Sequence, residues 1–572
     1  MYDIRKNIFR SVIYVSFVFL VLNLFYLQVI RYQFYKKRSL ENNIRVIPHE
    51  APRGIIYDRN NIALVSSRVS FDLAVVPYEI KDLDATLEKL SVLANIPKKS
   101  LYASYKKNYS APFIPTIVAM DIERSKAFFI DENIGLIKGT LLLANPRRHY
   151  QHAQALSHIT GYIGKMDEAE YGILREYGYK IREYVGKSGI EKYYNSYLRG
   201  DDGGIQVEVD AYSRQVRQLG YKVPQKGNDI YLTIDIGLQE LLYEMLKEDK
   251  AAAAVMDIKT GEMLALISTP GFNPNIFVDP NTQQQRSALL KDPDFPLLNR
   301  FISSAYPPGS IFKIVMAAAA LSVKKITRHT SFFCSGVYKL GNAEFKCWKS
   351  QGHGIEDLMQ GLVHSCNIFF YNVGRLIGAE VIHEYAIKFG LGECTGIDLP
   401  GEISGLVPSP FWKRVNVNQP WQGGDTLNFS IGQGYLLITP IQALRMVTII
   451  ANKYTMPRPY LVKKIGSRNI HPARPAKVAI TGKKDEFDII QKALFEVVND
   501  PTGTGQRAKV EGVSVCAKTG TAQVPSGETH AWIVGYLPYK DPKLSFIVFI
   551  EHGGAGGIKP ADTARILCKY LN

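Results

Sequence analysis

The sequence predicts an α+β protein in which an N-terminal transmembrane helix precedes two domains, the second built as a sheet flanked by helices. Three observations predict this organisation. An uncharged apolar segment lies near the N-terminus, residues 41–225 mix short strands, charged helices and turn clusters, and strand and helix signals alternate from residue 226 to the end. We therefore expect an anchor in residues 1–40, a first domain in residues 41–225 and a second domain in residues 226–572.

The anchor is predicted from the stretch between Ser11 and Ile30, which carries no formal charge and is rich in Val, Leu, Ile, Phe and Tyr. About 20 such residues cross a bilayer as a helix. A cleaved signal peptide would have a shorter apolar core followed by an Ala-x-Ala site, and no such site follows Ile30. We predict an uncleaved anchor. Basic residues flank it on both sides, so charge alone does not settle its orientation.

The composition excludes some partners. The chain has a formal net charge of +16, with 46% hydrophobic and 21% charged residues, which is an ordinary globular composition apart from the anchor. The positive charge is scattered, and we find no basic stripe with interleaved aromatic residues. Nucleic acid is therefore not expected as a partner. The functional interpretation of this positive charge is a weak attraction to anionic lipid or to an anionic wall polymer.

Residues 41–225 contain no candidate nucleophile in a convincing setting. The segment from Arg53 to Asn60 is predicted to be a strand and turn rather than a basic binding patch, because Gly54 and Asn60-Asn61 are turn residues. A turn at Gly227-Asn228 then leads to the strand-like run from Ile230 to Ile234. We expect the second domain to begin there.

Ser310 and Lys313 are the first candidate catalytic pair. Pro307-Pro308-Gly309 precedes them and the apolar run Ile314–Leu321 follows, which predicts a buried helix that starts near Ser310. Residues three apart on a helix share a face, so the hydroxyl and the amine can meet. Burial lowers the pKa of a lysine, so Lys313 can serve as a neutral base for Ser310.

The same Ser-x-x-Lys pattern occurs twice more, at Ser104–Lys107 and Ser322–Lys325. Both copies lie in stretches with paired lysines that look exposed, so we interpret them as solvated segments.

Two further short motifs follow Ser310 along the chain. Ser365-Cys366-Asn367 precedes a helix-like run, whereas its copy Ser467–Asn469 lies in a basic segment. Lys518-Thr519-Gly520 follows an apolar run and is predicted to be a strand beside a cleft. Of its two copies, Lys187–Gly189 and Lys259–Gly261, the latter is predicted to be a hairpin turn.

Ser-x-x-Lys, Ser-x-Asn and Lys-Thr-Gly in this order are the motifs of the penicillin-recognising serine enzymes. The chain resembles the class B penicillin-binding proteins over nearly its whole length, and within them the penicillin-binding protein 2 group of the rod-elongation machinery. The resemblance extends to Arg53–Asn60, to Gly186–Gly200, to the stretch from Gly424-Asp425-Thr426 to Gly434, and to His530-Ala531-Trp532. Cys366 departs from it, because the family motif has Asp there.

The resemblance implies a pedestal in residues 41–225, a transpeptidase fold in residues 226–572 and a role for each motif residue. Ser310 would attack a D-alanyl-D-alanine stem peptide with Lys313 as base, and an amine of a neighbouring peptide would accept the acyl group. Ser365 would relay a proton, and Asn367 would hold Lys313 and the substrate amide. Lys518, Thr519, Gly520 and Thr521 would bind the terminal carboxylate, and the backbone N–H groups of Ser310 and Thr521 would form an oxyanion hole.

His530 follows the third motif and could be taken for a catalytic base. Because Lys313 already supplies that base, we expect His530 to be a packing residue in the cleft wall.

Cys334, Cys347, His353 and Cys366 form a second candidate site. Three thiolates and an imidazole would make a closed tetrahedral zinc site. The tight Cys-x-x-Cys pairs typical of zinc sites are missing, so a Cys334–Cys347 disulfide and a set of buried free thiols remain as alternatives. The resemblance implies a metal in this region, since relatives can carry one there. Such a zinc would be structural and would hold the Ser365–Asn367 loop, while the chemistry itself requires no cofactor.

The predicted function is a serine-type peptidoglycan D,D-transpeptidase that crosslinks stem peptides during cell elongation and is inhibited by β-lactams. A β-lactamase is one alternative, but it needs a base that activates water and has no use for an anchor and a pedestal. A penicillin-binding sensor or assembly scaffold is the other, but it typically carries several spans or a signalling domain.

The expected partners are peptidoglycan stem peptides, the membrane, a RodA-type glycosyltransferase and other elongation proteins. The resemblance implies a single-pass protein of the inner (cytoplasmic) membrane with an extracytoplasmic catalytic domain.

Overall fold

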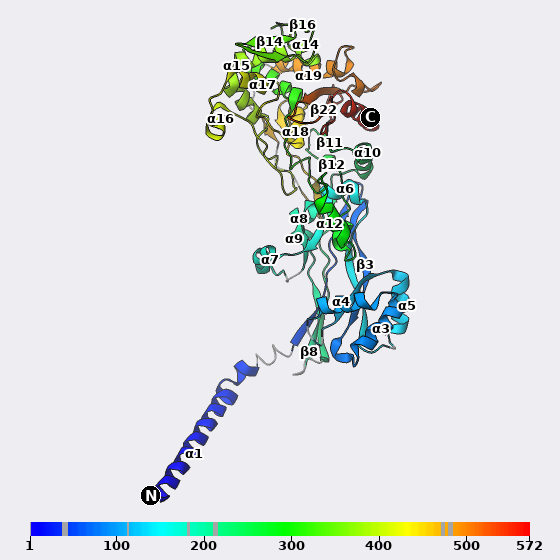
Figure 1. The fold of residues 1–572 in the computed structure, drawn as a ribbon, viewed down its shortest axis with the longest axis vertical. Coiled ribbons are helices and arrows are strands. Elements are labelled where there is room, and N and C mark those ends of the chain that lie inside the picture. The colour runs from blue at the N-terminus through cyan, green and yellow to red at the C-terminus, as the bar shows by residue number, and fades with distance from the viewer. Residues whose placement is uncertain are drawn as a thin grey trace. The chain divides into compact units, whose positions relative to one another are not determined.

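The computed structural model describes residues 2–36, 44–110, 112, 114–135, 137–179, 183–209, 215–470, 475–478 and 484–572 (Figure 1). The described chain forms two compact units. Unit 1 consists of Met1–Arg53, Arg68–Arg147 and Arg199–Gly227, and unit 2 consists of Gly54–Ser67, Arg148–Leu198 and Asn228–Asn572. The predicted boundary between residues 40 and 41 lies outside the described residues.

The chain begins with a long apolar helix. Helix α1 (Tyr2–Phe25) continues into a π-helical turn, η1 (Tyr26–Ile30). Within it, Lys6–Ile30 is a candidate membrane span of 25 residues with a mean hydropathy of 2.2. At 1.5 Å per residue this segment is roughly 37 Å long, more than the hydrocarbon core of about 30 Å. Its large apolar side chains are exposed, Phe17 by 66%, as expected of a surface that faces lipid.

Unit 1 contains two sheets and a helical layer. The first sheet has strands β1 (Ile44–His49), β8 (Gly203–Val209) and β9 (Gln215–Lys222). The second includes β3 (Ala63–Val75), β4 (Thr116–Ile122) and β5 (Thr140–Tyr150). Helices α3 (Leu83–Ala94), α4 (Lys98–Asn108) and α5 (Arg124–Ile134) bury leucine, alanine and isoleucine side chains against β3 and β4.

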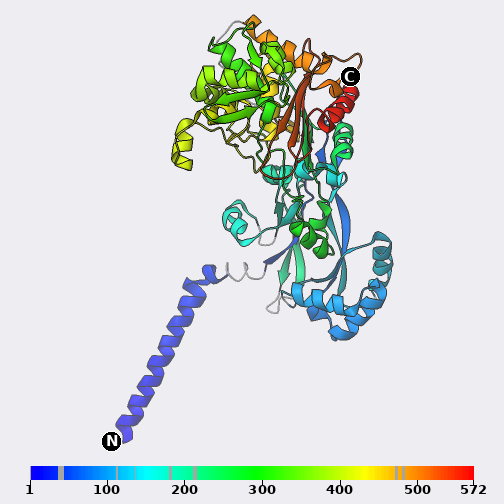
Figure 2. The same ribbon diagram turned by 45° about the horizontal axis from the view of Figure 1, so that its top comes forward.

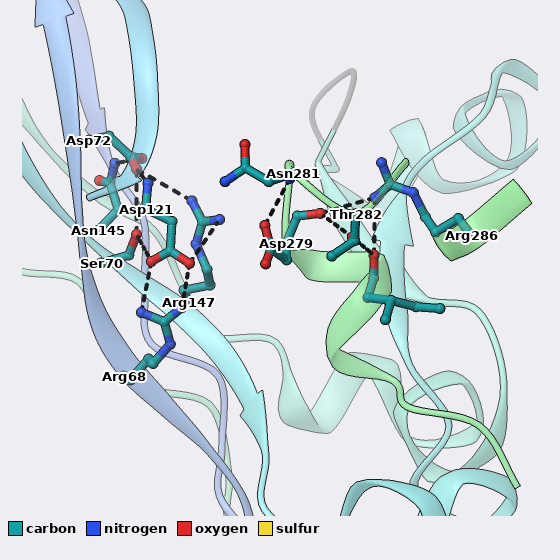
Figure 3. A network of polar contacts seen from close by, with 11 residues as sticks. Arg68, Ser70, Asp72, Asp121, Asn145, Arg147, Asp279, Asn281, Thr282 and Arg286 are labelled. Atoms are coloured by element: carbon teal, nitrogen blue, oxygen red, sulfur yellow. Dashed lines mark hydrogen bonds and ion pairs between the residues drawn. The ribbon is translucent and has the colours of Figure 1, made fainter. Parts of the chain in front are cut away.

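A polar network crosslinks the second sheet of unit 1 (Figure 3). The carboxylate of Asp72 on β3 is 4% exposed and accepts from the Asp121 backbone N–H at 2.9 Å, Asn145 Nδ2 at 3.0 Å and Arg147 at 3.3 Å. Asp121, on β4, in turn pairs with Arg68. Because these residues come from β3, β4 and β5, the network links the three strands through a charge that would be costly to bury alone.

Unit 2 is built on a five-stranded antiparallel sheet in the order β12-β11-β23-β22-β21. The strands are β11 (Ala251–Asp257), β12 (Met263–Thr269), β21 (Cys516–Ala522), β22 (His530–Leu537) and β23 (Leu544–Ile550). Strands β11 and β12 pair directly across the turn that contains Lys259–Gly261, which confirms the predicted hairpin. Nearly every residue of the sheet is buried, because helices cover both faces.

The two faces of this sheet carry different helices (Figures 1 and 2). Helices α10 (Ile236–Leu246) and α20 (Lys559–Tyr570) pack on one face, where alternate residues of β11 such as Ala253 and Val255 point. The other face, with Ala252 and Ala254, contributes to a large core that includes α13 (Lys313–Ser322), α15 (Asn367–Lys388) and α18 (Pro440–Ala451). The predicted class, α+β with a sheet flanked by helices, is confirmed.

Unit 2 also contains a further set of helices and strands. They are β2 (Ile56–Tyr57), α6 (Ala153–Thr160), β6 (Ile163–Lys165), α7 (Glu168–Leu174), β7 (Tyr184–Gly186), α8 (Gly189–Tyr193), α9 (Asn195–Leu198), β10 (Ile230–Leu232), α11 (Asn275–Val278), α12 (Gln283–Lys291), η4 (Gly309–Phe312), β13 (Phe332–Cys334), β14 (Val337–Leu340), β15 (Ala343–Lys346), β16 (Gly354–Glu356), α14 (Leu358–Val363), α16 (Pro410–Val417), α17 (Gly423–Ser430), β17 (Thr455–Met456), β18 (Val462–Ile465), β19 (Arg468–Asn469), β20 (Ala476–Lys477) and α19 (Lys484–Asn499).

Unit 2 also takes residues 54–67 and 148–198, which the sequence analysis groups with the first domain. Strand β2 pairs in parallel with β10, so the Arg53–Asn60 segment supplies a strand to unit 2. Arg148 and Glu191, with side chains 1% and 0% exposed, form an ion pair at 2.6 Å, and Arg148 also donates to the Gly54 carbonyl. Removing one partner of such a buried pair costs about 3 to 5 kcal/mol, so these segments are firmly part of unit 2.

Candidate active site and thiol cluster

Ser310 lies on a short 3₁₀ turn, η4, that leads directly into helix α13. Gly309 enters this turn with φ of +57°, which glycine adopts without strain. A Cβ on Gly309 would lie 2.7 Å from the Thr521 carbonyl oxygen, so glycine also permits the close approach of β21. The predicted helix near Ser310 is present, but its α-helical part begins at Lys313.

Lys313 is the first residue of α13 and is fully buried. Its ammonium donates to the Ser365 carbonyl at 2.8 Å, to Asn367 Oδ1 at 2.7 Å and to Ser365 Oγ at 3.3 Å. In the described part of the chain no hydrogen bond joins it to the Ser310 hydroxyl. The side chains at i and i+3 of a 3₁₀ turn eclipse one another, so the two residues still share a face.

Ser365 stands between two lysines. It connects α14 to α15 with φ of +55°, which is rare for a residue with a side chain. Its hydroxyl oxygen lies 3.3 Å from Lys313 Nζ and 3.0 Å from Lys518 Nζ. A hydroxyl in contact with both amines can pass a proton between them.

Burial sets the protonation of both lysines. It lowers the pKa of Lys313 to about 8, although the nearby Cys366 and Cys347 thiols act in the opposite direction. Deprotonation at pH 7 then costs about 1.4 kcal/mol, compared with about 5 kcal/mol for an ordinary lysine. Burial and the charge of Lys313 also lower the pKa of Lys518 well below its ordinary value.

Strand β21 presents the third motif at the edge of the sheet. The Thr519 hydroxyl bonds to Thr504 at 2.8 Å, and Thr521 Oγ1 accepts from the Gly556 N–H at 3.3 Å. The hydrogen of the exposed Thr521 hydroxyl is therefore available to a ligand. A Cβ on Gly520 would lie 3.0 Å from the Pro308 carbonyl oxygen, so this glycine lets β21 approach the Ser310 turn.

The other copies of the three sequence motifs lie outside this candidate site. On helix α4, Lys106 and Lys107 of the first copy are exposed, as expected. In the second copy Lys324 and Lys325 are exposed, but Ser322 is buried at the end of α13, so its predicted exposure was wrong. The predicted strand at Lys518 is confirmed, and Arg468–Asn469 forms an exposed edge strand.

The four predicted metal ligands come together beside Ser365. The sulfur atoms of Cys334, Cys347 and Cys366 and a ring nitrogen of His353 all lie within 4.8 Å of one another. His353 Nδ1 is 3.5 Å from Cys334 Sγ and 3.6 Å from Cys347 Sγ. All six cysteines of the chain, each of which the structure describes, are free thiols, so the alternative disulfide is not formed.

This donor set fits zinc. With Zn–S near 2.3 Å and Zn–N near 2.0 Å, a tetrahedral site needs sulfur and nitrogen about 3.5 Å apart, close to the separations found here. A hydrogen bond from the Cys366 thiol holds the pKa of Cys347 well below its ordinary value, so the cluster already favours a thiolate. His353 Nε2 is buried and has no partner among the described residues.

Cys366 has a second structural role. Its sulfur caps helix α15 by accepting from the Phe369 N–H at 3.4 Å. The Asp found at this position in the family motif can cap a helix in the same way, because side-chain acceptors at the N-cap satisfy the first free N–H groups.

Two supports of the site, Thr504 and Gly432, have no role assigned from the sequence. Thr504 contacts Thr519 from a loop with no pattern of its own. Gly432 accepts from the Gly309 N–H at 2.9 Å, and a Cβ on Gly432 would lie 2.2 Å from the Gly309 carbonyl oxygen. His530 is 7% exposed, and its Nδ1 accepts from the His552 N–H, so its predicted packing role is confirmed.

Comparison with known proteins agrees with this geometry. Residues 251–568 match the family model of the penicillin-binding protein transpeptidase domain. Residues 48–232 match that of the penicillin-binding protein dimerisation domain.

The chain belongs to the penicillin-binding protein family.

Individual relatives refine this result. The peptidoglycan D,D-transpeptidase MrdA of Escherichia coli K12 is 34% identical, over 94% of this chain and 89% of its own length. The MrdA of Acinetobacter baumannii is 30% identical, over 99% and 87%. PBP2 of Helicobacter pylori, solved in complex with MreC, has a TM-score of 0.83 at 30% identity and covers 92% of this chain and 98% of its own. The predicted resemblance to penicillin-binding protein 2 and the predicted class of enzyme, a serine-type D,D-transpeptidase, are confirmed.

Replacing Gly432 by Ala should slow acylation of the penicillin-binding protein by a β-lactam about tenfold or more. The new Cβ would displace the Gly309 carbonyl and with it the Ser310 turn, and small misplacements of reacting groups cost up to about a hundredfold in rate. The measurement is the second-order rate of labelling with a fluorescent penicillin.

Gly434→Ala is the matched control. Gly434 has φ of +77°, close to the +75° of Gly432, so both variants carry the same backbone strain. Its Cβ would meet only Asn428 Cβ at 3.5 Å, an ordinary contact. Equal loss of rate in both variants would refute the role of Gly432 in supporting Ser310.

Proposed function

We propose that Ser310 is the nucleophile with which this D,D-transpeptidase crosslinks stem peptides, through an acyl-enzyme, during cell elongation. The observation that supports this most is the fully buried Lys313, one turn after Ser310, with an amine whose pKa is lowered to about 8. Such an amine is neutral often enough near pH 7 to take a proton from a hydroxyl.

In the proposed reaction Ser310 Oγ attacks the carbonyl of the penultimate D-alanine as Lys313 takes its proton. The backbone N–H groups of Ser310 and Thr521 bind the oxyanion. Ser365, in contact with both lysines, passes a proton to the leaving nitrogen, and D-alanine departs. An amine of a second stem peptide then attacks the ester and releases Ser310.

Substrate binding is assigned to the edge of the sheet. Lys518 would bind the terminal carboxylate of the substrate. The negative charge of this carboxylate would favour the protonated form of Lys518, which burial disfavours in the free enzyme. Thr519 and Thr521 would donate hydrogen bonds to the same group, and Gly520 lets the strand lie close to the Ser310 turn. Asn367 would hold both Lys313 and a substrate amide.

For the other parts of the chain, we propose an anchor in residues 1–40, a pedestal in 41–225 and the transpeptidase in 226–572, extracytoplasmic on the inner membrane. The candidate span and the two family matches support this division. A RodA-type glycosyltransferase and other elongation proteins are the proposed partners. In support, the chain is similar, at a TM-score of 0.75 and 29% identity, to a chain of a peptidoglycan synthase complex that coordinates polymerization and crosslinking.

We also propose a structural zinc held by Cys334, Cys347, His353 and Cys366. Four protein ligands leave no position for water, so the metal would order the chain and take no part in the reaction. Because Cys366 lies between Ser365 and Asn367, binding would restrain the loop that contacts Lys313.

Fluorescent penicillin should label the full-length protein at Ser310, and Ser310→Ala should abolish the label. Peptide mapping of the adduct is the measurement, with conversion of stem peptides to crosslinked product followed in parallel. Label on Ser104 or Ser322 would mean that Ser310 is wrongly assigned. Label on Ser310 without crosslinked product would favour a scaffold.

The acylation rate should rise with pH between about 6 and 8 and then level off. The buried Lys313 accepts a proton only when neutral, and its neutral fraction increases about tenfold per pH unit until the pH reaches its pKa of about 8. An ordinary lysine would prolong the rise to about pH 10. A rate that stays flat or falls between pH 6 and 8 would count against Lys313 as the base.

Purified protein should contain about one zinc per chain, and Cys334→Ser should lower this content because it removes one of four ligands. Metal analysis by mass spectrometry is the measurement. Cys394→Ser is the control, since Cys394 is exposed and lies outside the cluster. Zinc-free protein with an intact fold, purified under reducing conditions, would contradict the proposal.

A further inference from the structure

The segment that carries Ser310 is held at its N-terminal side by contacts outside the three motifs. Residues 303–308 form neither a helix nor a continuous strand. Tyr306 is tied to Ile438 by two backbone hydrogen bonds, of 2.8 and 2.9 Å. Trp532 Nε1 on β22 donates to the Pro307 carbonyl at 3.1 Å. Such a segment needs fixed neighbours if Ser310 is to stay aligned.

A side-chain network adds a third attachment, to the end of strand β23. Glu551 follows β23 directly, and its Oε1 accepts a hydrogen bond from the Tyr306 hydroxyl. The same oxygen accepts from Arg300 Nε at 3.1 Å. Burial and the charge of Glu551 raise the pKa of Tyr306, so the phenol stays protonated and can donate.

Arg300 keeps the Glu551 carboxylate in place. Its side chain is 2% exposed and that of Glu551 is 15% exposed, so the pair is largely removed from water. Arg300 also donates to the backbone carbonyl of Asp294 at 2.7 Å, and its own N–H donates to Ser268 Oγ at 2.9 Å. A guanidinium held at several points is a rigid support, because its donors are fixed in one plane.

The Tyr306 ring lies between this network and the sheet. Its centroid is 4.3 Å from that of Phe549 on β23 and 5.4 Å from that of His530 on β22. The hydroxyl bond to Glu551 therefore fixes the rotation of a ring that is already packed against both strands.

We propose that Arg300, Glu551 and Tyr306 form a positioning relay for the nucleophile. Arg300 holds Glu551, Glu551 holds the Tyr306 hydroxyl, and Tyr306 sets the path of Pro307–Gly309 and so the place of the Ser310 hydroxyl relative to Lys313. None of the three touches the reacting atoms. The inference rests on the proposed role of Ser310 as nucleophile and adds residues outside the motifs to its alignment.

A second tyrosine offers a matched control. Tyr460 is 9% exposed, as is Tyr306, and its hydroxyl donates to a glutamate, Glu262, at 3.3 Å in the same unit. Tyr460→Phe therefore removes the same kind of bond, with the same loss of one oxygen atom, away from Ser310.

The experiment measures acylation of the full-length protein by fluorescent penicillin in stopped flow, which separates the dissociation constant from the rate of acylation. Tyr306→Phe should lower the acylation rate about tenfold at an unchanged dissociation constant, since alignment of bound groups and not binding is affected. Tyr460→Phe should acylate at the wild-type rate. Glu551→Gln, which still offers an acceptor oxygen, should lose less than Tyr306→Phe.

The pH profile supplies a second readout, which tests whether the pKa of the proposed base, Lys313, is disturbed. Tyr306→Phe should keep the wild-type midpoint, because Lys313 is unchanged, and lower the rate at every pH. A wild-type rate in Tyr306→Phe, or an equal loss in Tyr460→Phe, would overturn the relay. If Tyr306→Phe does not fold, the same comparison of Glu551→Gln with Tyr460→Phe decides the question, and a wild-type rate in Glu551→Gln overturns the relay. Wild-type protein without label on Ser310 would instead overturn the proposed function itself.

Discussion

Two buried lysines that share one serine hydroxyl are the constraint on which the catalytic unit depends. Lys313 and Lys518 are both fully buried, and both amines contact Ser365 Oγ. The two nitrogens lie 3.3 and 3.0 Å from the same oxygen and so within about 6 Å of each other, where two positive charges repel by roughly 2.6 kcal/mol or more at an effective dielectric of 20. Burial lowers the pKa of both lysines, and the charge of Lys313 lowers the pKa of Lys518 further, so positive charge is withdrawn when no anion is bound. In the proposed reaction a substrate carboxylate would supply the missing negative charge, so binding and proton transfer would be coupled by the same electrostatics.

This constraint explains why so much of unit 2 is packed around three short motifs. Lys313 and Ser365 are 52 residues apart in the chain, and Ser365 and Lys518 are 153 apart. They meet because every residue of α13 is buried against α15 and the sheet. Close backbone approaches at Gly309, Gly432 and Gly520 bring the Ser310 turn against β21. In the proposed relay, the same turn is also held from the side of β23 by Arg300, Glu551 and Tyr306. A nucleophile on an irregular segment needs this support, since alignment within fractions of an ångström decides the rate.

The thiol cluster is part of the same arrangement of residues around Ser365. Ser365 has a left-handed backbone conformation that a residue with a side chain adopts at a cost, so the surrounding loop must be held. Cys366 can hold this loop in two ways, because its sulfur caps α15 and also lies among the other thiols. The change from Asp to Cys in the second motif is therefore compatible with the motif's role: the cap is retained, and the thiol would add a soft ligand to the proposed zinc site.

The sequence alone determined the elements whose patterns are local. The apolar run after Ser310 predicts a buried helix, the flanks of Lys259–Gly261 predict a hairpin, and the uncharged stretch from Ser11 predicts the N-terminal helix. The order of the motifs indicated the family, and it is also the basis for the choice of Ser310, Ser365 and Lys518 among their copies as proposed site residues. The predicted helices and hairpin are present because periodicity and turn residues act over a few positions.

Only the tertiary structure decided what depends on distant pairing. It assigned residues 54–67 and 148–198 to unit 2, through strand β2 and the Arg148–Glu191 pair. It showed that Lys313 contacts Ser365 and that, among the described residues, no hydrogen bond joins it to the Ser310 hydroxyl, whereas its contact with Asn367 was already implied by the family resemblance. It also placed Thr504 and Gly432 beside the site and revealed the contacts on which the proposed Arg300–Glu551–Tyr306 relay rests. No distinctive local pattern marks Thr504, Arg300, Tyr306 or Glu551. Their roles come from burial and from contacts between segments far apart in the chain, which a one-dimensional pattern does not encode.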